Sequence, residues 1–152
     1  MCGICGFHSG QSGRPVEKDR ISRMNDALAH RGPDDSGVWY RERVALGARR
    51  LSVMDVARGH QPMTNEDESL VVAFNGEIYN AEEIRQSLKR DGVSFKTTCD
   101  TEVVLRAWEA EGEAALERFN GMFAIAIYHA PEDRLWLVRD RLGIKPLFYT
   151  EG

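Results

Sequence analysis

Cys2 stands directly behind the initiator methionine, in the opening stretch MCGICGF. Cytosolic processing commonly removes Met1 when the second residue is small, which would leave Cys2 with a free α-amine beside its own thiol. The thiol is a nucleophile and the amine is a base, so one residue would carry both partners of covalent catalysis. Whether this pair does chemistry depends on the other groups that the chain supplies.

The cysteines also allow two other kinds of site. Cys2 and Cys5 form a C-x-x-C pattern, but redox motifs of this type follow a strand and open a helix, whereas this one lies inside a strand-like run. A zinc site would draw on Cys2, Cys5, His8 and Cys99, which lack the paired spacing of a structural site. Three cysteines cannot all pair within one chain, and free thiols are the default in a reducing compartment.

Polar residues gather in three further stretches where hydrophobic periodicity does not require them: HRGPDDSG (30–37), FNGEIYN (74–80) and TCDTE (98–102). Each has an ordinary structural explanation when it is taken singly. Asn75-Gly76 is a common turn pair, Asp100 a common helix N-cap, Arg50 an ordinary exposed cation, and Asp34 and Asp35 ordinary loop acids.

The pattern of apolar residues predicts the elements that must position these groups. Strands are expected at 3–8, as a hairpin within 36–55, at 69–80 leading into a turn, as a pair within 121–140 joined by a Pro-Glu-Asp turn, and at 145–152. Helices are expected at 16–31, at 81–92 after Asn80 as N-cap, and at 101–112 after Asp100. Composition favours an α/β or α+β protein, and the paired antiparallel strands favour a sandwich.

Length and charge narrow the class of protein. The chain has 152 residues, enough for one domain, and a net charge of −4 with acidic and basic residues interspersed. No basic stripe suggests a nucleic acid partner, and no stretch approaches the ~20 apolar residues that span a bilayer. No signal peptide is visible, so a cytoplasmic protein is expected.

The joint order of the motifs is specific. MCGICGF, HRGPDDSG, ARRLSVMD, QPM, FNGEIYN, TCDTE, GMFAIAIY and RDRLGIKPLFY resemble, in this order, the N-terminal glutaminase domain of asparagine synthetases. These are class II glutamine amidotransferases of the N-terminal nucleophile hydrolase type. The resemblance covers essentially the whole chain and implies an α+β fold, a four-layer αββα sandwich of two antiparallel sheets flanked by helices.

The resemblance also implies roles for individual residues. Cys2 would attack the side-chain amide of L-glutamine, with its own α-amine as the base, while the Asn75 side chain and the Gly76 N–H stabilise the oxyanion. Glutamine would be held by Arg50, Leu51, Val53, Glu77 and Asp100. The family pattern places the carboxylate clamp at the arginine directly before Leu51, hence at Arg50 and not at Arg49. His30 is left out of the catalytic set because a free amine makes a histidine base unnecessary.

The resemblance implies partners beyond these residues. Residues 1–152 would be an amidotransferase domain, incomplete at its C-terminus and followed by a synthetase domain that uses ATP and Mg²⁺ to make asparagine. The chain shows no Gly-rich pyrophosphate-binding loop, so no cofactor and no metal is expected in this domain. A homodimer of the full-length protein is expected, with no nucleic acid and no membrane partner. An amidotransferase with a different ammonia acceptor, in secondary metabolism or polysaccharide modification, is the alternative.

Overall fold

The computed structural model describes residues 2–10, 15–51 and 59–151. The strands are β1 (Gly3–His8), β2 (Asp35–Arg41), β3 (Val44–Arg50), β4 (Met63–Thr64), β5 (Leu70–Ile78), β6 (Gly121–His129) and β7 (Arg134–Arg139). The helices are α1 (Lys18–Ala27), α2 (Ala81–Arg90), α3 (Asp100–Glu111) and α4 (Ala115–Arg118), with short 3₁₀ turns η2 (Ala29–Arg31), η3 (Gly112–Ala114) and η4 (Ala130–Glu132).

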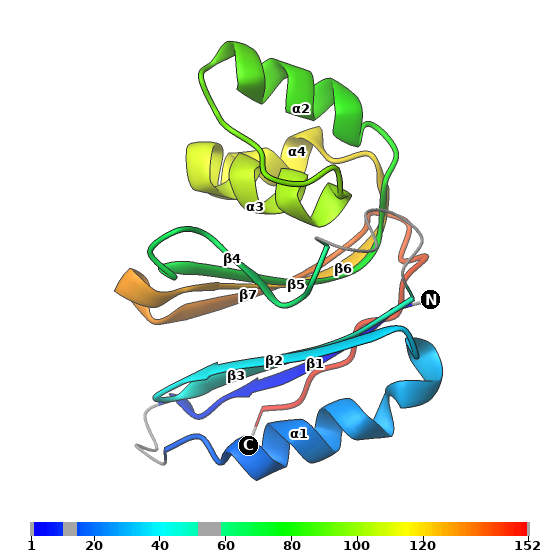
Figure 1. The fold of residues 1–152 in the computed structure, drawn as a ribbon, viewed down its shortest axis with the longest axis vertical. Coiled ribbons are helices and arrows are strands. Elements are labelled where there is room, and N and C mark those ends of the chain that lie inside the picture. The colour runs from blue at the N-terminus through cyan, green and yellow to red at the C-terminus, as the bar shows by residue number, and fades with distance from the viewer. Residues whose placement is uncertain (1, 11–14, 52–58, 152) are drawn as a thin grey trace.

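The strands form two antiparallel sheets that face each other. The first sheet has the order β1-β3-β2 and the second the order β4-β5-β6-β7. In Figure 1, α1 covers the outer face of the first sheet, while α2, α3 and α4 lie outside the second. The layers therefore run helix, sheet, sheet, helix, which confirms the αββα sandwich expected from the sequence.

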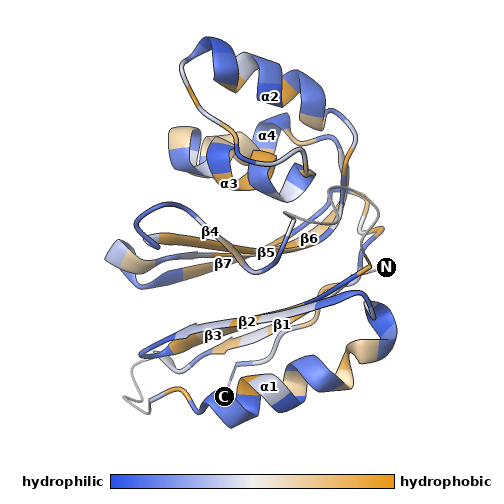
Figure 2. Cartoon of the chain, in the orientation of Figure 1, coloured by the Kyte–Doolittle hydropathy of each residue, from blue (hydrophilic) through white to orange (hydrophobic). Residues whose placement is uncertain are grey.

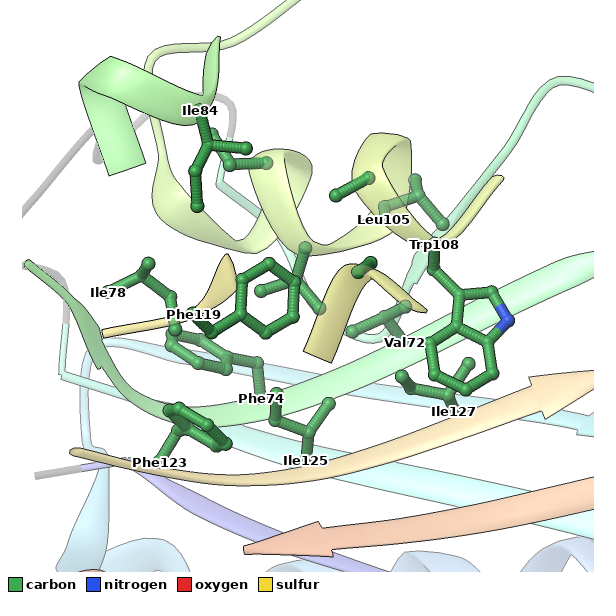
Figure 3. Packing of buried hydrophobic residues seen from close by; sticks show 14 of the residues in the cluster. Val72, Phe74, Ile78, Ile84, Leu105, Trp108, Phe119, Phe123, Ile125 and Ile127 are labelled. Carbon is green, nitrogen blue, oxygen red and sulfur yellow. The ribbon is translucent and has the colours of Figure 1, made fainter. Parts of the chain in front are cut away.

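Alternation along β5 builds two cores from one strand, because successive side chains of a strand point to opposite faces. Val72 and Phe74 face the helices and pack in the larger core with residues such as Leu105 and Phe119 (Figure 3). Val71 and Ala73 face the first sheet and join the smaller core between the sheets. Figure 2 shows apolar residues along the strands and polar residues over the outer surfaces of the helices.

The first helix is shorter than the sequence predicts. α1 ends at Ala27, and residues 29–31 form the 3₁₀ turn η2 instead of a further helical turn. The chain then passes close to the end of β3, since a Cβ on Gly32 would lie 2.4 Å from the backbone nitrogen of Arg50. Pro33 also forms an isolated bridge with Arg50. The helix therefore stops where the chain must return to the first sheet.

Asn75 and Gly76 lie in a strand and not in the expected turn. Both belong to β5, where they pair with Ala124 and Phe123 of β6. A Cβ on Gly76 would stand 2.1 Å from the carbonyl oxygen of Met122, so the glycine permits a close approach of two backbones. The prediction of a turn was wrong because strand pairing outweighed the local preference of Asn-Gly.

Three smaller predictions have mixed outcomes. Asp100 is the first residue of α3, whose N-cap is Cys99, so that prediction was wrong. Asn80 is the N-cap residue of α2 as predicted, although its side chain makes no capping hydrogen bond. Asn80 instead donates to the carbonyl oxygen of Arg118 at 2.9 Å. Residues 145–151 form no strand in the structure, because none of the described strands pairs with them.

Candidate active site at one end of the sandwich

Three strand ends meet where the chain begins. β1 and β3 pair with Gly3 opposite Arg49, so one step further along this register brings Cys2 opposite Arg50. The Cys2 thiol lies 3.9 Å from the carbonyl oxygen of Leu51. The ends of β1, β3 and β5 lie at the same side of the molecule in Figure 1, close to the N-terminus.

The alternation of side chains along β3 and β5 directs several of the predicted residues toward the region between the two sheets. Val44 and Leu46 of β3 face the second sheet, which places Arg50 on that same face. Val71 and Ala73 of β5 face the first sheet, which places Asn75 and Glu77 toward the same space from the opposite side. Arg50 and Asn75 are both 6% exposed. Arg50, Asn75 and Glu77 are therefore directed toward the region between the sheets, at the end where the chain begins.

The two adjacent arginines have different surroundings. Arg49 donates to the backbone oxygen of Asn25 at 3.0 Å and forms an ion pair with Asp26 at 2.5 Å, so it ties β3 to α1. Arg50 lies against Gly59, where an added Cβ would be 2.3 Å from Nη2 of the guanidinium. Arg50 thus lies on the face of β3 that is turned toward the second sheet, whereas Arg49 has a structural role on the other face.

Asp100 reaches the end of β5 from the helix layer. Its Oδ2 accepts a hydrogen bond from the backbone nitrogen of Ile78 at 3.3 Å. Burial raises the pKa of the Asp100 carboxyl, and the nearby Glu77 carboxylate adds a smaller contribution in the same direction. Asp100 is half-buried and Glu77 is exposed, and two acids near each other attract a cation such as an ammonium group.

The remaining predicted residues are placed in part. Leu51 is 39% exposed and contributes its carbonyl oxygen next to Cys2. Val53 lies outside the described residues. His30 is exposed, and its Nδ1 lies 3.1 Å from the backbone oxygen of Ala27 at the end of α1.

Cys5 faces away from the candidate site. A Cβ on Gly47 would touch both the Cys5 sulfur and Asn25 of α1, so Cys5 lies between the first sheet and the helix. Burial raises the pKa of the Cys5 thiol to about 11, which makes it a poor nucleophile. Across the described ranges, no three His, Cys, Asp or Glu side chains come together as a metal site. This geometry does not support pairing Cys5 with Cys2 in a redox or zinc site.

Two residues near the site were missed by the sequence analysis. Gly59 packs against the Arg50 guanidinium, and the buried Gln61 bonds to both β5 and α3. The QPM stretch contains Gln61, and its place in the motif order was the signal available in the sequence. Its partners lie far away in the sequence, so the motif alone could not assign its role.

Membrane insertion through a helix is not supported by the part of the chain that the structure describes. The longest helix, α3, has 12 residues, and none of these helices is long and apolar enough to cross a bilayer.

Comparison with known proteins gives consistent matches. A family model described as a glutamine amidotransferase domain matches residues 1–152. Glutamine-hydrolysing asparagine synthetase 3 of Bacillus subtilis (strain 168) is 41% identical over 153 residues, which cover 99% of this chain and 25% of that protein. Synthetase 2 of the same organism is 44% identical over 153 residues, covering 99% of this chain and 20% of that protein. The chain thus spans a fifth to a quarter of these relatives.

A solved structure supports the fold. The glutamine phosphoribosylpyrophosphate amidotransferase from B. subtilis, in complex with ADP and GMP, matches with a TM-score of 0.73 at 21% identity. The match covers 95% of this chain and 38% of that chain. This likeness concerns the fold, and the family match over residues 1–152 shows that this chain belongs to the glutamine amidotransferase domain family.

Proposed function

We propose that Cys2 hydrolyses the side-chain amide of glutamine and supplies ammonia for the synthesis of asparagine from aspartate. The observation that carries this proposal is the placement of four groups at one end of the sandwich. The Cys2 thiol, the Arg50 guanidinium, the Asn75 amide and the Asp100 carboxyl come from different elements and gather at the same strand ends. Relatives named as glutamine-hydrolysing asparagine synthetases favour this acceptor.

The chemistry begins at the N-terminus. Removal of Met1 would give Cys2 an α-amine with a pKa of ~7.7 to 8.0, well matched to a thiol of ~8.5. The amine takes the thiol proton, in our proposal through a bridging water, and the sulfur attacks the amide carbon of glutamine. The tetrahedral intermediate collapses with departure of ammonia, which takes up the proton, and leaves a γ-glutamyl thioester. Water then hydrolyses the thioester to glutamate and restores the thiol.

The oxyanion of the intermediate needs donors that are already in place. The Asn75 side chain and the Gly76 N–H are proposed for this role, and each such donor typically contributes ~3 kcal/mol. Both belong to β5, which is paired with β6 along its length. A rigid paired strand keeps donors in position better than a turn does, so the correction from turn to strand favours this role.

Recognition of glutamine is assigned to groups at its other end. Arg50 offers a planar fork for the α-carboxylate, while Asp100 and Glu77 lie together for the α-ammonium. Leu51 and Val53, which the resemblance adds to the pocket, remain part of the proposal.

The acceptor and the cofactors belong to a further part of the protein in this proposal. ATP and Mg²⁺ would act in a synthetase domain that activates aspartate. No step of the glutamine hydrolysis proposed for residues 1–152 uses ATP or Mg²⁺. A cytoplasmic location and a homodimer of the full-length protein stay predictions of the sequence.

The test is Cys2→Ala in the full-length protein. Release of ammonia from glutamine should fall by about 10⁴-fold or more, since nucleophile and base act as a unit. Synthesis of asparagine from added ammonium, ATP and aspartate should continue, because that chemistry would lie in another domain.

The matched control is Cys5→Ser, which should hydrolyse glutamine at nearly the original rate. Loss of activity in the Cys5 variant together with retention in the Cys2 variant would contradict the proposal. If the unaltered protein hydrolyses glutamine but makes no asparagine, the proposed glutamine hydrolysis stands and the ammonia acceptor is a molecule other than aspartate.

A further inference from the structure

Gln61 connects two parts of the candidate site through a single buried side chain. The residue is 4% exposed, and its side-chain amide makes two hydrogen bonds. Oε1 accepts from the backbone nitrogen of Phe74 at 2.8 Å, and Nε2 donates to the hydroxyl oxygen of Thr101 at 3.0 Å. Because a backbone N–H can only donate, the oxygen of the amide must face Phe74, which fixes its orientation.

The two partners of Gln61 are sequence neighbours of residues proposed to act on glutamine. Phe74 directly precedes Asn75 in β5, and Thr101 directly follows Asp100 in α3. β5 pairs with β6 on one side, while its other neighbour, β4, ends at Thr64 and pairs only with residues 71 and 72. The Gln61 side chain therefore supplies a bond at Phe74, beyond the short ladder between β4 and β5.

The segment that carries Gln61 also contacts the first sheet. Two residues earlier, Gly59 lies against the Arg50 guanidinium, where a Cβ would stand 2.3 Å from Nη2. The carbonyl oxygen of Gln61 itself lies so close to β2 that a Cβ on Gly37 would be 2.0 Å from it. Residues 59–61 are thus packed against both sheets and against the first turn of α3.

We propose that Gln61 is a positioning residue that sets the Asp100 carboxyl and the Asn75 amide relative to Arg50. This role rests on the proposed hydrolysis of glutamine. The distance between the carboxylate clamp and the ammonium acid must match the two charged groups on the α-carbon of glutamine. Arg50 belongs to the first sheet and Asp100 to the helix layer behind the second, so a link between these layers is needed to fix that distance.

The residue type suits this position. An amide offers an acceptor and a donor on one planar group, so it satisfies a backbone N–H and a hydroxyl at the same time. A glutamate would lose the donor, and a methionine would lose both bonds while it keeps a similar length. Either change leaves a buried polar group without a partner, which is more costly than the loss of the bond alone.

The experiment measures recognition of the α-ammonium group and not activity alone. Glutaramate, which is glutamine without its α-amino group, keeps the amide and the carboxylate but offers nothing to Asp100. We compare kcat/KM for glutamine with kcat/KM for glutaramate in the unaltered protein, in Thr101→Val and in Thr101→Ser. Thr101→Val removes the hydroxyl that accepts from Gln61, whereas Thr101→Ser keeps it.

Thr101→Val should lower the preference for glutamine over glutaramate by about tenfold, as expected for one broken buried hydrogen bond. The loss should appear in KM for glutamine with little change in kcat, and Thr101→Ser should restore the preference. Gln61→Met should show the same loss of preference and also a lower kcat for both substrates, because it frees the backbone next to Asn75. Gln86→Met, at an exposed glutamine on α2, should leave all these constants unchanged.

The outcomes separate this inference from the proposed function. An unaltered protein that does not hydrolyse glutamine would refute the function itself. The unaltered protein could hydrolyse glutamine while Thr101→Val keeps the preference for glutamine over glutaramate and only melts at a lower temperature. The bond between Gln61 and Thr101 would then be merely structural, and the inference would be overturned. If Gln61→Met does not fold, the pair Thr101→Val and Thr101→Ser decides the matter.

Discussion

Two acids at opposite ends of the sheet sandwich, Asp133 and Asp100, differ in how their negative charge is stabilised. At the end far from Cys2, Asp133 accepts hydrogen bonds from Nε2 of His8 and from the hydroxyl of Tyr128, both at 3.0 Å. Arg43 adds an ion pair with Asp133 at 3.2 Å. Because Gly10 donates to the other ring nitrogen of His8, the proton of the neutral ring is on Nε2.

This far cluster joins the sheets through groups that satisfy one another. His8 and Arg43 belong to the first sheet and its β2–β3 turn, whereas Tyr128 and Asp133 belong to the second sheet and its β6–β7 turn. The donors, His8 first, lower the pKa of the Asp133 carboxyl. Burial, together with the hydrogen bond to Asp133, raises the pKa of Tyr128 to about 12. The acid is therefore held in its charged form by the protein itself.

Asp100, at the Cys2 end, has the opposite shift. Burial raises the pKa of its carboxyl, and its acidic neighbour Glu77 adds to the effect. Among residues 2–10, 15–51 and 59–151, no basic side chain forms an ion pair with Asp100 as Arg43 does with Asp133, and a bound ammonium group would supply such a partner. The comparison shows two ways to hold a partly buried acid: hydrogen-bond donors and a cation of the protein surround Asp133, whereas in our proposal the substrate supplies the cation for Asp100.

The largest effect within this comparison is expected from the two adjacent arginines. Arg50→Ala should raise KM for glutamine by more than about thirtyfold, because removing one partner of a buried charge pair costs about 2–5 kcal/mol. Arg49→Ala should leave KM unchanged and lower the free energy of unfolding by about 1–2 kcal/mol, since it loses its bonds to Asn25 and Asp26. Steady-state kinetics and urea denaturation of both variants test this assignment. A large rise in KM for Arg49→Ala with an unchanged KM for Arg50→Ala would contradict it.

A smaller effect is expected at Asp100, with opposite signs for binding and stability. Asp100→Asn should raise KM for glutamine at least about tenfold, because the amide keeps a bond to Ile78 but loses the charge. The folded form of the acid binds its proton more tightly than the unfolded form does. Stability of the unaltered protein therefore falls as pH rises from about 4 through the raised pKa.

At neutral pH, Asp100→Asn should consequently melt at a higher temperature than the unaltered protein. The difference should disappear at acidic pH, where the carboxyl is protonated in both states. Melting curves that show a destabilised variant at pH 7 would mean that Asp100 is a satisfied acid like Asp133, and the contrast between the two ends would fail.

The smallest effect is expected at Asp133. Asp133→Asn suits the left-handed backbone at this position (φ 49°), since asparagine tolerates that conformation as well as aspartate does. Because the pKa of the Asp133 carboxyl is lower in the folded protein, its ionised form stabilises the fold at pH values above the pKa of the unfolded chain. This contribution to stability is lost as the pH falls through the pKa of the folded protein. The variant should therefore melt a few degrees lower at pH 7, and the difference should shrink below about pH 4. Its kinetics with glutamine should not change, and a change would tie this end to the site.

The sequence predicted most elements because their signals are local. Alternating or continuous apolar residues marked β1, β5 and β6, and helical spacing with Gly92 and Gly112 as stop signals marked α2 and α3. Such patterns report how a segment of chain prefers to fold and which of its faces is apolar. The order of the motifs in the sequence also singled out Cys2 as the nucleophile of the proposed reaction.

The tertiary structure decided what depends on partners that are distant in the sequence. Alternation places Arg49 and Arg50 on opposite faces of β3, but only the packing of α1 shows which face is turned away from the second sheet. Pairing with β6 made Asn75-Gly76 a strand instead of a turn.

The bonds that organise the candidate site have the same long-range character. Gln61 reaches Thr101 across 40 positions, and Asp100 reaches Ile78 across 22. At the opposite end, His8 meets Asp133 across 125 positions. The sequence of a segment determines which side chains it carries and which secondary structure it prefers. The burial and charge around each group, and hence its pKa and its chemistry, arise only when distant segments exclude water together.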